Sequence, residues 1–294
     1  MAEVWTVLKI LEWTGEYLEK HGVAGGRREA EILLADLLGL NRVGLYLNFD
    51  RPLDAGELDR FRERVRRRAR REPVQYILGR TEFWSLPLVV GPAVLIPRPD
   101  TEVLVEEALR RAPDARAVLD VGTGSGAIAV ALSSELPEAV VEGIDLSPEA
   151  LEVARENGRR NGLDERLRFS AGEMKRLPAG PYDLIVANPP YIPRADLAGL
   201  MPEVREHEPR IALDGGEDGL DCYRLLAAGA MDRLGAGGWL LLEVGIDQAA
   251  EVERLLRQGG FQETFRRADY SGIPRVVGGR APGENRGGPR REEV

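Results

Sequence analysis

The strongest constraint on the fold of this 294-residue chain is a series of apolar runs in its second half, separated by helical patterns. The four clearest runs are AVLDVG, VVEGIDLS, YDLIVANPP and GGWLLLEVG. Runs that are almost continuously apolar are typical of parallel strands, whose two faces are both covered by helices. One intervening helix is expected to begin with Ser147 as its N-cap and Pro148 at its first position. We therefore predict an α/β fold with a mostly parallel sheet and helices on both faces.

The first 73 residues have a helical pattern instead. In VWTVLKILEWTGEYLEKHG and RREAEILLADLLGL the apolar residues recur at three- and four-residue steps, as one face of a helix requires. A third helix is predicted in LDAGELDRFRERVRRRARREP, where Asp54 and Glu57 have the spacing of a capping box and Pro73 ends the pattern. We predict that residues 1–73 form a small helical bundle.

The remaining segments have their own composition. Residues 74–99 contain VQYILG, FWSLPLVV and AVLIP, which are short, rich in β-branched and aromatic residues, and separated by glycine and proline. This pattern predicts a β-hairpin connector. The sheet domain then occupies residues 100–278, and residues 279–294 are expected to be a disordered tail because glycine, proline and charged residues dominate them.

Charge and composition exclude several classes of function. A net charge of −9 argues against extensive wrapping of nucleic acid. Cys222 is the only cysteine and the two histidines, His21 and His207, are far apart, so a disulfide framework or a zinc centre is not expected. The N-terminus does not resemble a signal peptide, and no apolar run is long enough to span a membrane. We expect a cytoplasmic protein.

A glycine-rich turn follows the first of the four runs, in LDVGTGSGAIAVAL. Gly122, Gly124 and Gly126 permit close approach of a ligand to the backbone, and the following helix offers free N–H groups. Turns of this kind bind dinucleotides, nucleotides or S-adenosylmethionine, and some only pack tightly. The third glycine comes one residue too early for a dinucleotide fingerprint, and Asp145 ends the next strand, where it can accept both hydroxyls of a ribose. The spacing favours an adenosine cofactor held without a phosphate clamp.

The run IVANPPYIPR raises a separate question, because a buried strand ends there in an amide and two prolines. Pro189 and Pro190 have no N–H and restrict φ, so the turn is rigid. The Asn188 side-chain oxygen and the Pro189 carbonyl can together accept both hydrogens of an NH₂ group, and Tyr191 can supply a flat wall. A turn with only a structural role would show the same N-P signal.

Such a pair of acceptors addresses a chemical problem. The nitrogen of an amide or an aryl amine is a poor nucleophile because its lone pair is delocalised. Acceptors for its hydrogens increase its electron density and hold it in line with an electrophile. A methyl group on a sulfonium requires neither a metal nor a covalent intermediate, in agreement with the scarcity of histidine and cysteine.

These motifs resemble those of a known family. DVGTGSGAIAV, IDLSPEAL and IVANPPYI are similar to the class I S-adenosylmethionine-dependent methyltransferases, which have a Rossmann-like sheet. EPVQYILGRTEFWSLPLVVGPAVLIPRPDTEVLVEEAL and EVREHEPRIALDGGEDGLDCYRLL closely resemble the release factor glutamine methyltransferases of the HemK/PrmC family. The resemblance extends to about Gly278. It implies transfer of a methyl group from S-adenosylmethionine to the side-chain N5 of the glutamine in the GGQ motif of peptide-chain release factors.

The resemblance also implies roles for particular residues. Asp145 would hold the ribose, and either Glu173 or Met174 would line the adenine pocket, Met174 being the chemically suitable apolar residue. Phe83 and the LIPRP segment would close over the ligands. The cofactor loop would comprise Gly122, Thr123, Gly124, Ser125 and Gly126, with Asn188 beside the cofactor. The substrate glutamine would be bound by Asn188, Pro189, Pro190 and Tyr191, of which Asn188, Pro189 and Tyr191 would act in catalysis.

Several alternatives remain open at this point. The sister enzymes that methylate a glutamine of a ribosomal protein share the loop, the acid and the Asn-Pro-Pro-Tyr turn. Methylation of adenine N6 in nucleic acid would require a basic groove, and a non-catalytic adenosine-binding module would not need the turn. The basic segment RERVRRRARREP is either a solvated helix face or a contact for the protein substrate through Arg66, Arg67, Arg68 and Arg70. We expect a monomeric enzyme whose N-terminal bundle recognises the release factor, without stable nucleic-acid or membrane binding.

Overall fold

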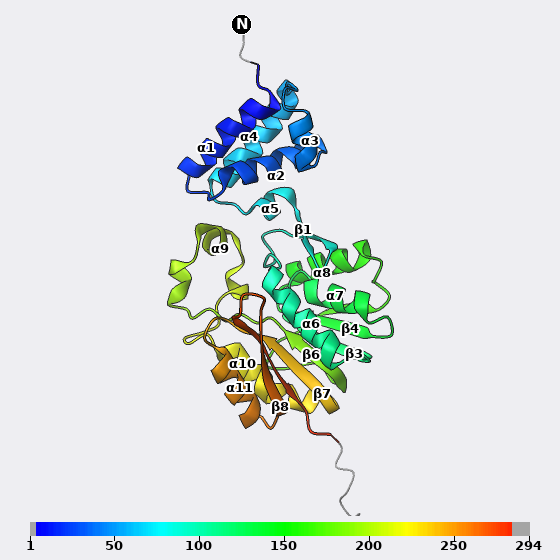
Figure 1. Cartoon of the computed structure of the whole chain (residues 1–294). Coiled ribbons are helices and arrows are strands. Elements are labelled where there is room, and N and C mark those ends of the chain that lie inside the picture. Colours follow the sequence, from blue (N-terminus) through cyan, green and yellow to red (C-terminus); the bar gives the residue numbers. More distant parts are fainter. Residues whose placement is uncertain (1–3, 284–294) are drawn as a thin grey trace, which may run out of the picture. The chain divides into compact units, whose positions relative to one another are not determined.

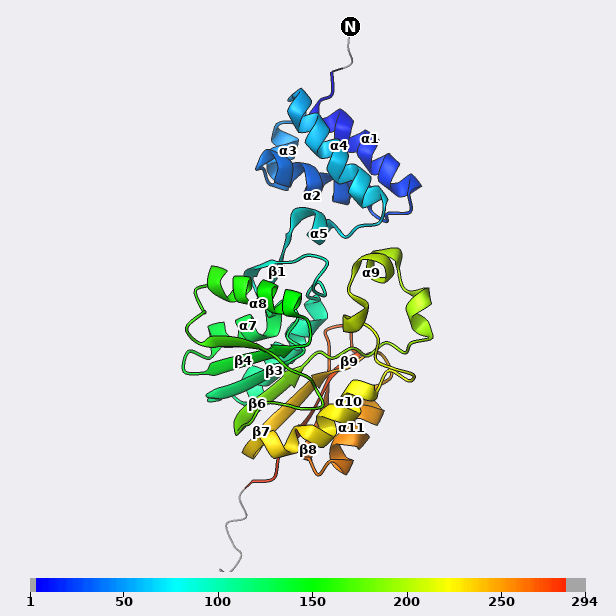
Figure 2. The same ribbon diagram turned by 180° about the vertical axis from the view of Figure 1, so that it is seen from behind.

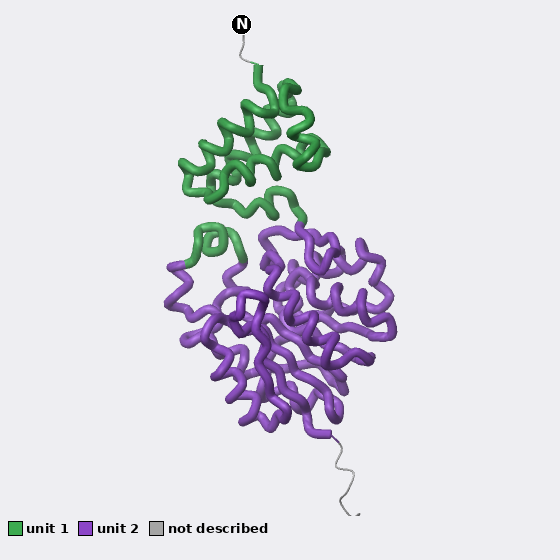
Figure 3. Tube along the Cα trace, in the orientation of Figure 1, with its two compact units in different colours: residues 1–80, 200–208 green, residues 81–199, 209–294 purple. Residues whose placement is uncertain are grey.

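The computed structural model describes residues 4–283, which fall into two compact units. Unit 1 contains residues 1–80 and 200–208, and unit 2 contains residues 81–199 and 209–294 (Figure 3). The boundary lies seven residues beyond the end predicted for the bundle at residue 73 (80 − 73), and unit 1 also includes a segment from the second half of the chain. Each unit has its own hydrophobic core, and each is described separately below.

Unit 1 is helical, as the sequence predicts. Its helices are α1 (Val7–Lys20), α2 (Gly26–Leu38), α3 (Arg42–Leu47), α4 (Ala55–Ala69), α5 (Val74–Leu78) and α9 (Pro202–His207) (Figure 1). The capping box of Asp54 and Glu57 is present at the start of α4, with both reciprocal hydrogen bonds formed. Apolar faces of α1, α2 and α4 enclose one core that contains Leu18, Leu34 and Phe61.

Two short segments of the connector differ from the prediction. VQYILG contains helix α5, not a strand, because Pro73 occupies its N-cap with a φ of −55° and the segment buries two consecutive residues, Tyr76 and Ile77. Five residues are too few for the periodicity to distinguish a helix from a strand. AVLIP is not a strand either, since residues 93–97 are irregular with only Val94 and Ile96 buried.

The predicted hairpin itself is present in unit 2. Strands β1 (Arg80–Phe83) and β2 (Leu86–Val89) pair in a two-stranded sheet. Trp84 and Ser85 form the two-residue turn with φ values of 54° and 57°, the left-handed conformation that such turns require. Phe83 is a buried core residue packed with Leu88, so it does not cover a ligand site as expected.

Unit 2 is built on a seven-stranded sheet with the order β5-β4-β3-β6-β7-β9-β8. The strands are β3 (Ala117–Val121), β4 (Val140–Asp145), β5 (Leu167–Ala171), β6 (Tyr182–Ala187), β7 (Leu234–Glu243), β8 (Gln262–Ala268) and β9 (Pro274–Arg280). Strands β5, β4, β3, β6 and β7 are parallel, and β9 pairs antiparallel with both β7 and β8. The predicted mostly parallel sheet is therefore confirmed.

Helices cover both faces of this sheet. Helices α6 (Glu102–Arg111), α7 (Ala127–Glu135) and α8 (Pro148–Arg160) lie on one face, and α10 (Asp221–Gly229) and α11 (Ala249–Gln258) lie on the other (Figure 2). Neighbouring strand residues enter different cores: Leu184 packs with the first group of helices and Ile185 with the second. Both faces of the strands are thus buried, which explains their continuous apolar sequences.

The predicted tail begins later than the sequence suggests. Gly279 and Arg280 belong to β9, where they pair with Leu240 and Trp239 of β7. A side chain at Gly279 would collide with Phe261, so glycine there serves close packing and not disorder. Residues 284–294 of the predicted tail lie outside the described residues.

Candidate active site

Three loops meet at the carboxyl edge of the parallel strands. In the register of the sheet, Val121 of β3 pairs with Ile144 of β4 on one side and with Ala187 of β6 on the other. The residues that follow these strands are therefore neighbours, although they are far apart in the sequence. Open α/β sheets bind their ligands at this edge.

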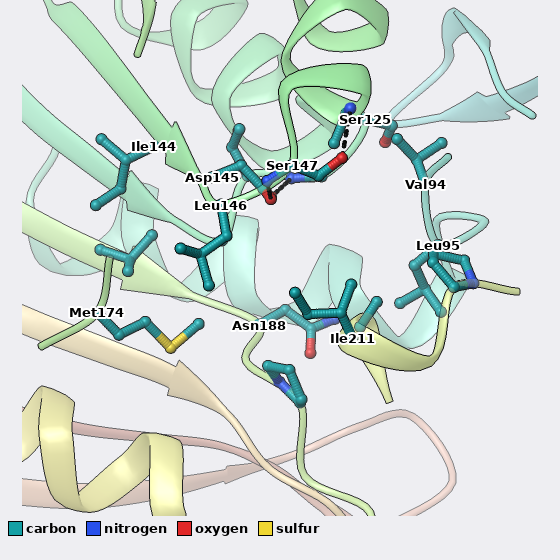
Figure 4. A pocket seen from close by; sticks show the side chains of 18 of the residues that line it. Val94, Leu95, Ser125, Ile144, Asp145, Leu146, Ser147, Met174, Asn188 and Ile211 are labelled. Atoms are coloured by element: carbon teal, nitrogen blue, oxygen red, sulfur yellow. Dashed lines mark hydrogen bonds between the residues drawn. The ribbon is translucent and has the colours of Figure 1, made fainter. Parts of the chain in front are cut away.

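A cavity of about 410 Å³ opens at this edge within unit 2. Figure 4 shows Asp145 and Ser147 on one side of it and Asn188 across from them, with Val94, Leu95 and Ile211 at a third side. Most of its lining is apolar, and several of the lining apolar side chains are exposed, among them Leu146, Ile211 and Leu225. Of the predicted site residues, those that line the cavity are Gly122, Thr123, Gly124, Ser125, Asp145, Met174, Asn188 and Pro190, together with Glu173.

The glycine loop has the backbone conformation that its sequence predicts. Gly122, Gly124 and Gly126 have φ values of 74°, 54° and 78°, which favour glycine. Gly126 does not line the cavity: it is the N-cap of α7, and a side chain there would collide with Ala154. The third glycine therefore serves helix packing, while the first two present their backbone to the cavity.

Asp145 is held in a fixed orientation at the end of β4. Its Oδ2 accepts a hydrogen bond from the Gly124 N–H at 2.8 Å, and its Oδ1 accepts one from the Ser147 N–H at 2.9 Å. Each carboxylate oxygen retains a further lone pair. The carboxylate can therefore accept two more hydrogen bonds side by side, as a ribose diol would require.

Met174 and Glu173, the two candidates for an adenine wall, have different surroundings. Met174 packs directly on the glycine loop, since a methyl group added to Gly122 would lie 3.1 Å from its Cε. Glu173 also lines the cavity, but its carboxylate pairs with Lys175 at 2.7 Å. Met174 is the residue whose apolar side chain is available to a planar ring.

Asn188 stands where the predicted strand ends. Ile185, Val186 and Ala187 are fully buried in β6, as predicted, and Asn188 is half-buried at the cavity. Its Nδ2 donates to Thr101 Oγ1 at 3.3 Å. No donor to its Oδ1 is found in the described part of the chain, so this oxygen is an open acceptor.

The chain after Asn188 is clamped from behind. Gln248 Nε2 donates to the Tyr191 carbonyl at 2.8 Å. The Ile192 N–H donates to the Leu213 carbonyl, and the Gly215 N–H donates to the Ile192 carbonyl. A side chain at Gly219 would lie 2.4 Å from the Tyr191 carbonyl, so the glycines of DGGEDGL permit this close approach. Pro189 and Tyr191 do not line the cavity; the Tyr191 ring packs toward Gly245.

Three functional candidates could not be found from sequence patterns. Asp120 and Glu243 are carboxyl groups buried beside the glycine loop and Asn188, and Thr101 hydrogen-bonds to Asn188 from a segment 87 residues earlier. Burial raises the pKa of Asp120 to about 7, against the lowering effect of the Thr123 hydroxyl, which donates to it at 2.6 Å. The only sequence signal is an acidic residue inside an otherwise apolar strand, as in VLDV and LLEV.

Most of the other residues that the sequence suggested for function form ion pairs or hydrogen bonds away from the cavity. In unit 1, Arg68 pairs with Glu29 and Glu203, and Arg67 pairs with Glu72, whereas Arg66 is mainly exposed. His207 Nε2 lies 3.2 Å from the Arg70 carbonyl oxygen on the surface. Cys222, which as a lone small apolar residue on a helix is expected to be buried, is only half-buried and lines the cavity, and burial raises the pKa of its thiol to about 11.

Residues 4–283 contain no helix both long and apolar enough to cross a membrane. They also contain no group of three or more His, Cys, Asp or Glu side chains arranged to hold a metal ion.

Solved structures define the class of this fold. The hMettl16 catalytic domain in complex with the MAT2A 3′UTR hairpin 6 superimposes with a TM-score of 0.58 at 15% identity, covering 82% of this chain and 87% of that one. A methyltransferase from Pyrococcus furiosus gives a TM-score of 0.51 at 19% identity, covering 67% of this chain and 89% of that one. At such identities the likeness shows the fold alone, which is that of methyltransferases.

Sequence relatives specify the family. Family models match the PrmC N-terminal domain at residues 9–79 and the methyltransferase small domain at residues 99–200. The release factor glutamine methyltransferase of Geobacter sulfurreducens is 56% identical over 95% of this chain and 98% of its own length. That of Bradyrhizobium diazoefficiens is 46% identical over 86% of this chain and 87% of its own length. The chain belongs to the family of release factor glutamine methyltransferases.

Proposed function

We propose that this protein methylates the side-chain nitrogen of a glutamine in a peptide-chain release factor, namely the N5 of the glutamine in the GGQ motif. The observation that supports this most strongly is the 56% identity to a release factor glutamine methyltransferase along nearly the whole of both chains. The open acceptor of Asn188 at the cavity supports the same chemistry independently.

The cofactor is S-adenosylmethionine, which supplies the methyl group as an electrophile on a sulfonium. The residues present fit this group. Gly122, Thr123, Gly124 and Ser125 offer close backbone approach for its amino-acid part, because no side chain on the glycines blocks the cavity. Asp145 has the free lone pairs for the ribose hydroxyls, and Met174 has the apolar surface for the adenine.

The substrate amide would be held by acceptors alone. Asn188 Oδ1, which faces the cavity, accepts one of its N–H groups, and the Pro189 carbonyl is the proposed second acceptor although Pro189 itself does not line the cavity. Two acceptors increase the electron density on nitrogen and fix the direction of its lone pair. The prolines and the clamp formed by Gln248 keep the acceptors in place, so little orientation has to be lost on binding. The nitrogen loses one proton to water as its new bond to carbon forms, and no side chain is required as a base.

The test uses labelled S-adenosylmethionine with a purified release factor, a ribosomal protein or DNA, and locates the label by mass spectrometry. We expect label on the GGQ glutamine and a loss of roughly 10²- to 10³-fold in kcat for Asn188→Ala, the usual effect of removing one preorganised hydrogen-bonding partner. Asn161→Ala is the matched control, because Asn161 lies at the C-cap of α8 outside the cavity. Label on the ribosomal protein or DNA, or full activity of Asn188→Ala, would contradict the proposal.

A further inference from the structure

Glu243 is a buried carboxyl group behind Asn188 that the proposed mechanism does not use. It is the last residue of β7, which is the neighbour of β6 in the sheet, and Ala187 pairs with Leu242. Asn188 follows Ala187, and Glu243 follows Leu242. Asn188 and Glu243 are therefore adjacent. The Glu243 side chain is 2% exposed, and its Oε2 has no hydrogen-bond partner among the described residues.

Thr101 completes this group of side chains. It precedes α6, is 4% exposed, and accepts a hydrogen bond from Asn188 Nδ2. The Thr101 and Asn188 side chains both lower the pKa of the Glu243 carboxyl, against burial, which is the effect of hydrogen-bond donors directed at it. An ionised carboxylate has only acceptors, so the NH₂ of Asn188, and not its oxygen, must face Glu243.

We propose that Glu243 is a positioning residue for methyl transfer, because its carboxylate and Thr101 retain the NH₂ of Asn188 and thereby leave Asn188 Oδ1 to accept from the substrate amide. This inference rests on the proposed function of the site. An asparagine side chain is nearly symmetric in shape, so packing alone does not select one of its two orientations. A buried acceptor does select it, since the reversed orientation would place two oxygen atoms against each other.

The surroundings of Glu243 determine when it is ionised. The cation that acts on it is Arg275 of β9, and Arg275 already pairs with Asp100 at 3.1 Å and Asp269 at 3.2 Å. Asp100 adds a negative charge, and the hydroxyls of Tyr191 and Tyr223 are the neighbouring titratable groups, Tyr223 donating to the Glu243 backbone carbonyl at 2.9 Å. Burial raises the pKa of Glu243 to about 7, against the effects of Thr101, Arg275 and Asn188. A protonated Glu243 can donate to Asn188 Oδ1 and so permit the reversed orientation.

The first test replaces the carboxylate by an amide of the same shape. In Glu243→Gln the new NH₂ faces the NH₂ of Asn188, and one amide must turn. We expect kcat for release factor methylation to fall by roughly 10²-fold, with the affinity for S-adenosylmethionine retained. The decline of kcat on the acid side of pH 7 should also change in this variant. Glu107→Gln is the matched control, since Glu107 is an equally buried carboxyl group that pairs with Arg110 and Arg111 away from the cavity.

The second test exchanges the two functional groups. Asn188→Asp alone places two carboxyl groups together and should be nearly inactive. Adding Glu243→Gln supplies an NH₂ for the new carboxylate at position 188 and leaves the other oxygen of that carboxylate as the acceptor for the substrate. We expect the double variant to be at least about tenfold more active than Asn188→Asp, which corresponds to about 1.4 kcal/mol. A double variant no more active than Asn188→Asp would overturn the proposal.

A spectroscopic measurement separates this inference from the proposed function. The side-chain NH₂ resonances of Asn188 can be assigned in a ¹H–¹⁵N spectrum by their absence in Asn188→Ala. They should shift in Glu243→Gln and remain in place in Glu107→Gln. Unshifted Asn188 resonances would overturn the role of Glu243, even if the wild-type protein methylates the release factor. Shifted resonances support it whether or not methylation is found, and an inactive wild-type protein would contradict only the proposed function.

Discussion

The ion-pair networks of unit 1 and the edge of the cavity in unit 2 shift the pKa values of their carboxyl groups in opposite directions. In unit 1, Glu31 is 3% exposed and accepts hydrogen bonds from Arg27, Arg42 and Tyr46. Burial by itself would raise the pKa of Glu31, but these three donors outweigh it, and the pKa lies below its usual value. The pKa of Glu203 is lowered in the same way. Burial by itself would raise it, but the hydrogen bonds donated by Arg71 and Arg68 outweigh this effect.

In unit 2, two buried carboxyl groups beside the residues that line the cavity have no such compensation. Asp120 accepts from Thr123 and Glu243 is approached by Thr101 and Asn188, and each retains a buried oxygen with no partner among the described residues. Burial raises the pKa of both groups to about 7. An unsatisfied buried polar atom reduces stability, and such atoms are concentrated at functional sites.

The difference implies opposite pH dependences of stability. A carboxyl group whose pKa is raised on folding binds its proton more tightly in the native state, so stability declines as pH rises from the unfolded to the folded pKa. A carboxyl group whose pKa is lowered contributes stability above its unfolded pKa, and this contribution is lost as pH falls through the folded value. Asp120 and Glu243 should therefore destabilise unit 2 as the pH rises toward neutral, whereas Glu31 and Glu203 should destabilise unit 1 as the pH falls toward acid.

The largest expected effect concerns unit 2. Between about pH 4 and pH 7 the contributions of Asp120 and Glu243 to its free energy of unfolding should decline, each by on the order of 3 kcal/mol. The double variant Asp120→Asn/Glu243→Gln should remove most of this decline. Hydrogen exchange of peptides from β3 and β7, followed as a function of pH in urea, measures it. An equal decline in the variant would mean that these groups are compensated in the native protein.

Helix starts and the shared edge of the parallel strands could be predicted from the sequence. Asp54, Ser147 and Pro148 act within a few residues of their own helix, and the structure confirms all three at the predicted helix starts. The positions of Asp145 and Asn188 at one edge also followed from strand patterns, because parallel strands share their carboxyl edge.

Contacts between distant segments could not be predicted in the same way. The proximity of Glu243 to Asn188 depends on the register of β6 with β7, and that of Thr101 depends on how the chain enters α6. Asp120 and Glu243 are single acidic residues within apolar strands, and no periodic pattern in the sequence marks them as part of the site. Helix α5 and the irregular AVLIP segment were mistaken for strands because short apolar runs suit either conformation until their tertiary contacts are known.

A smaller effect is expected in the ion-pair network of unit 1. Arg68 is 6% exposed and donates to Glu29 and Glu203 at 3.0 Å each. Arg68→Met should reduce the stability of this unit by about 2 kcal/mol, since two partly buried carboxylates lose a partner while Arg71 retains Glu203. Hydrogen exchange of peptides from α4 and α9 measures the loss. Arg66→Met is the control, because Arg66 is mainly exposed, and equal losses would contradict the distinction.

The smallest effect concerns Glu31 itself. Glu31→Gln should reduce the stability of unit 1 at pH 7 by about 1 kcal/mol, because Arg42 and Tyr46 are exposed enough to regain water when the charge is lost. Below the unfolded pKa of a glutamate the wild-type protein loses the same contribution, so the two proteins should converge in stability as pH falls. Urea unfolding at pH 7 and pH 3, read from peptides of α2, measures this convergence. A difference in stability of the same size at both pH values would show that the packing of Glu31, and not its ionisation, sets its contribution to stability. The contrast with Asp120 and Glu243 would then be one of side-chain shape and not of charge.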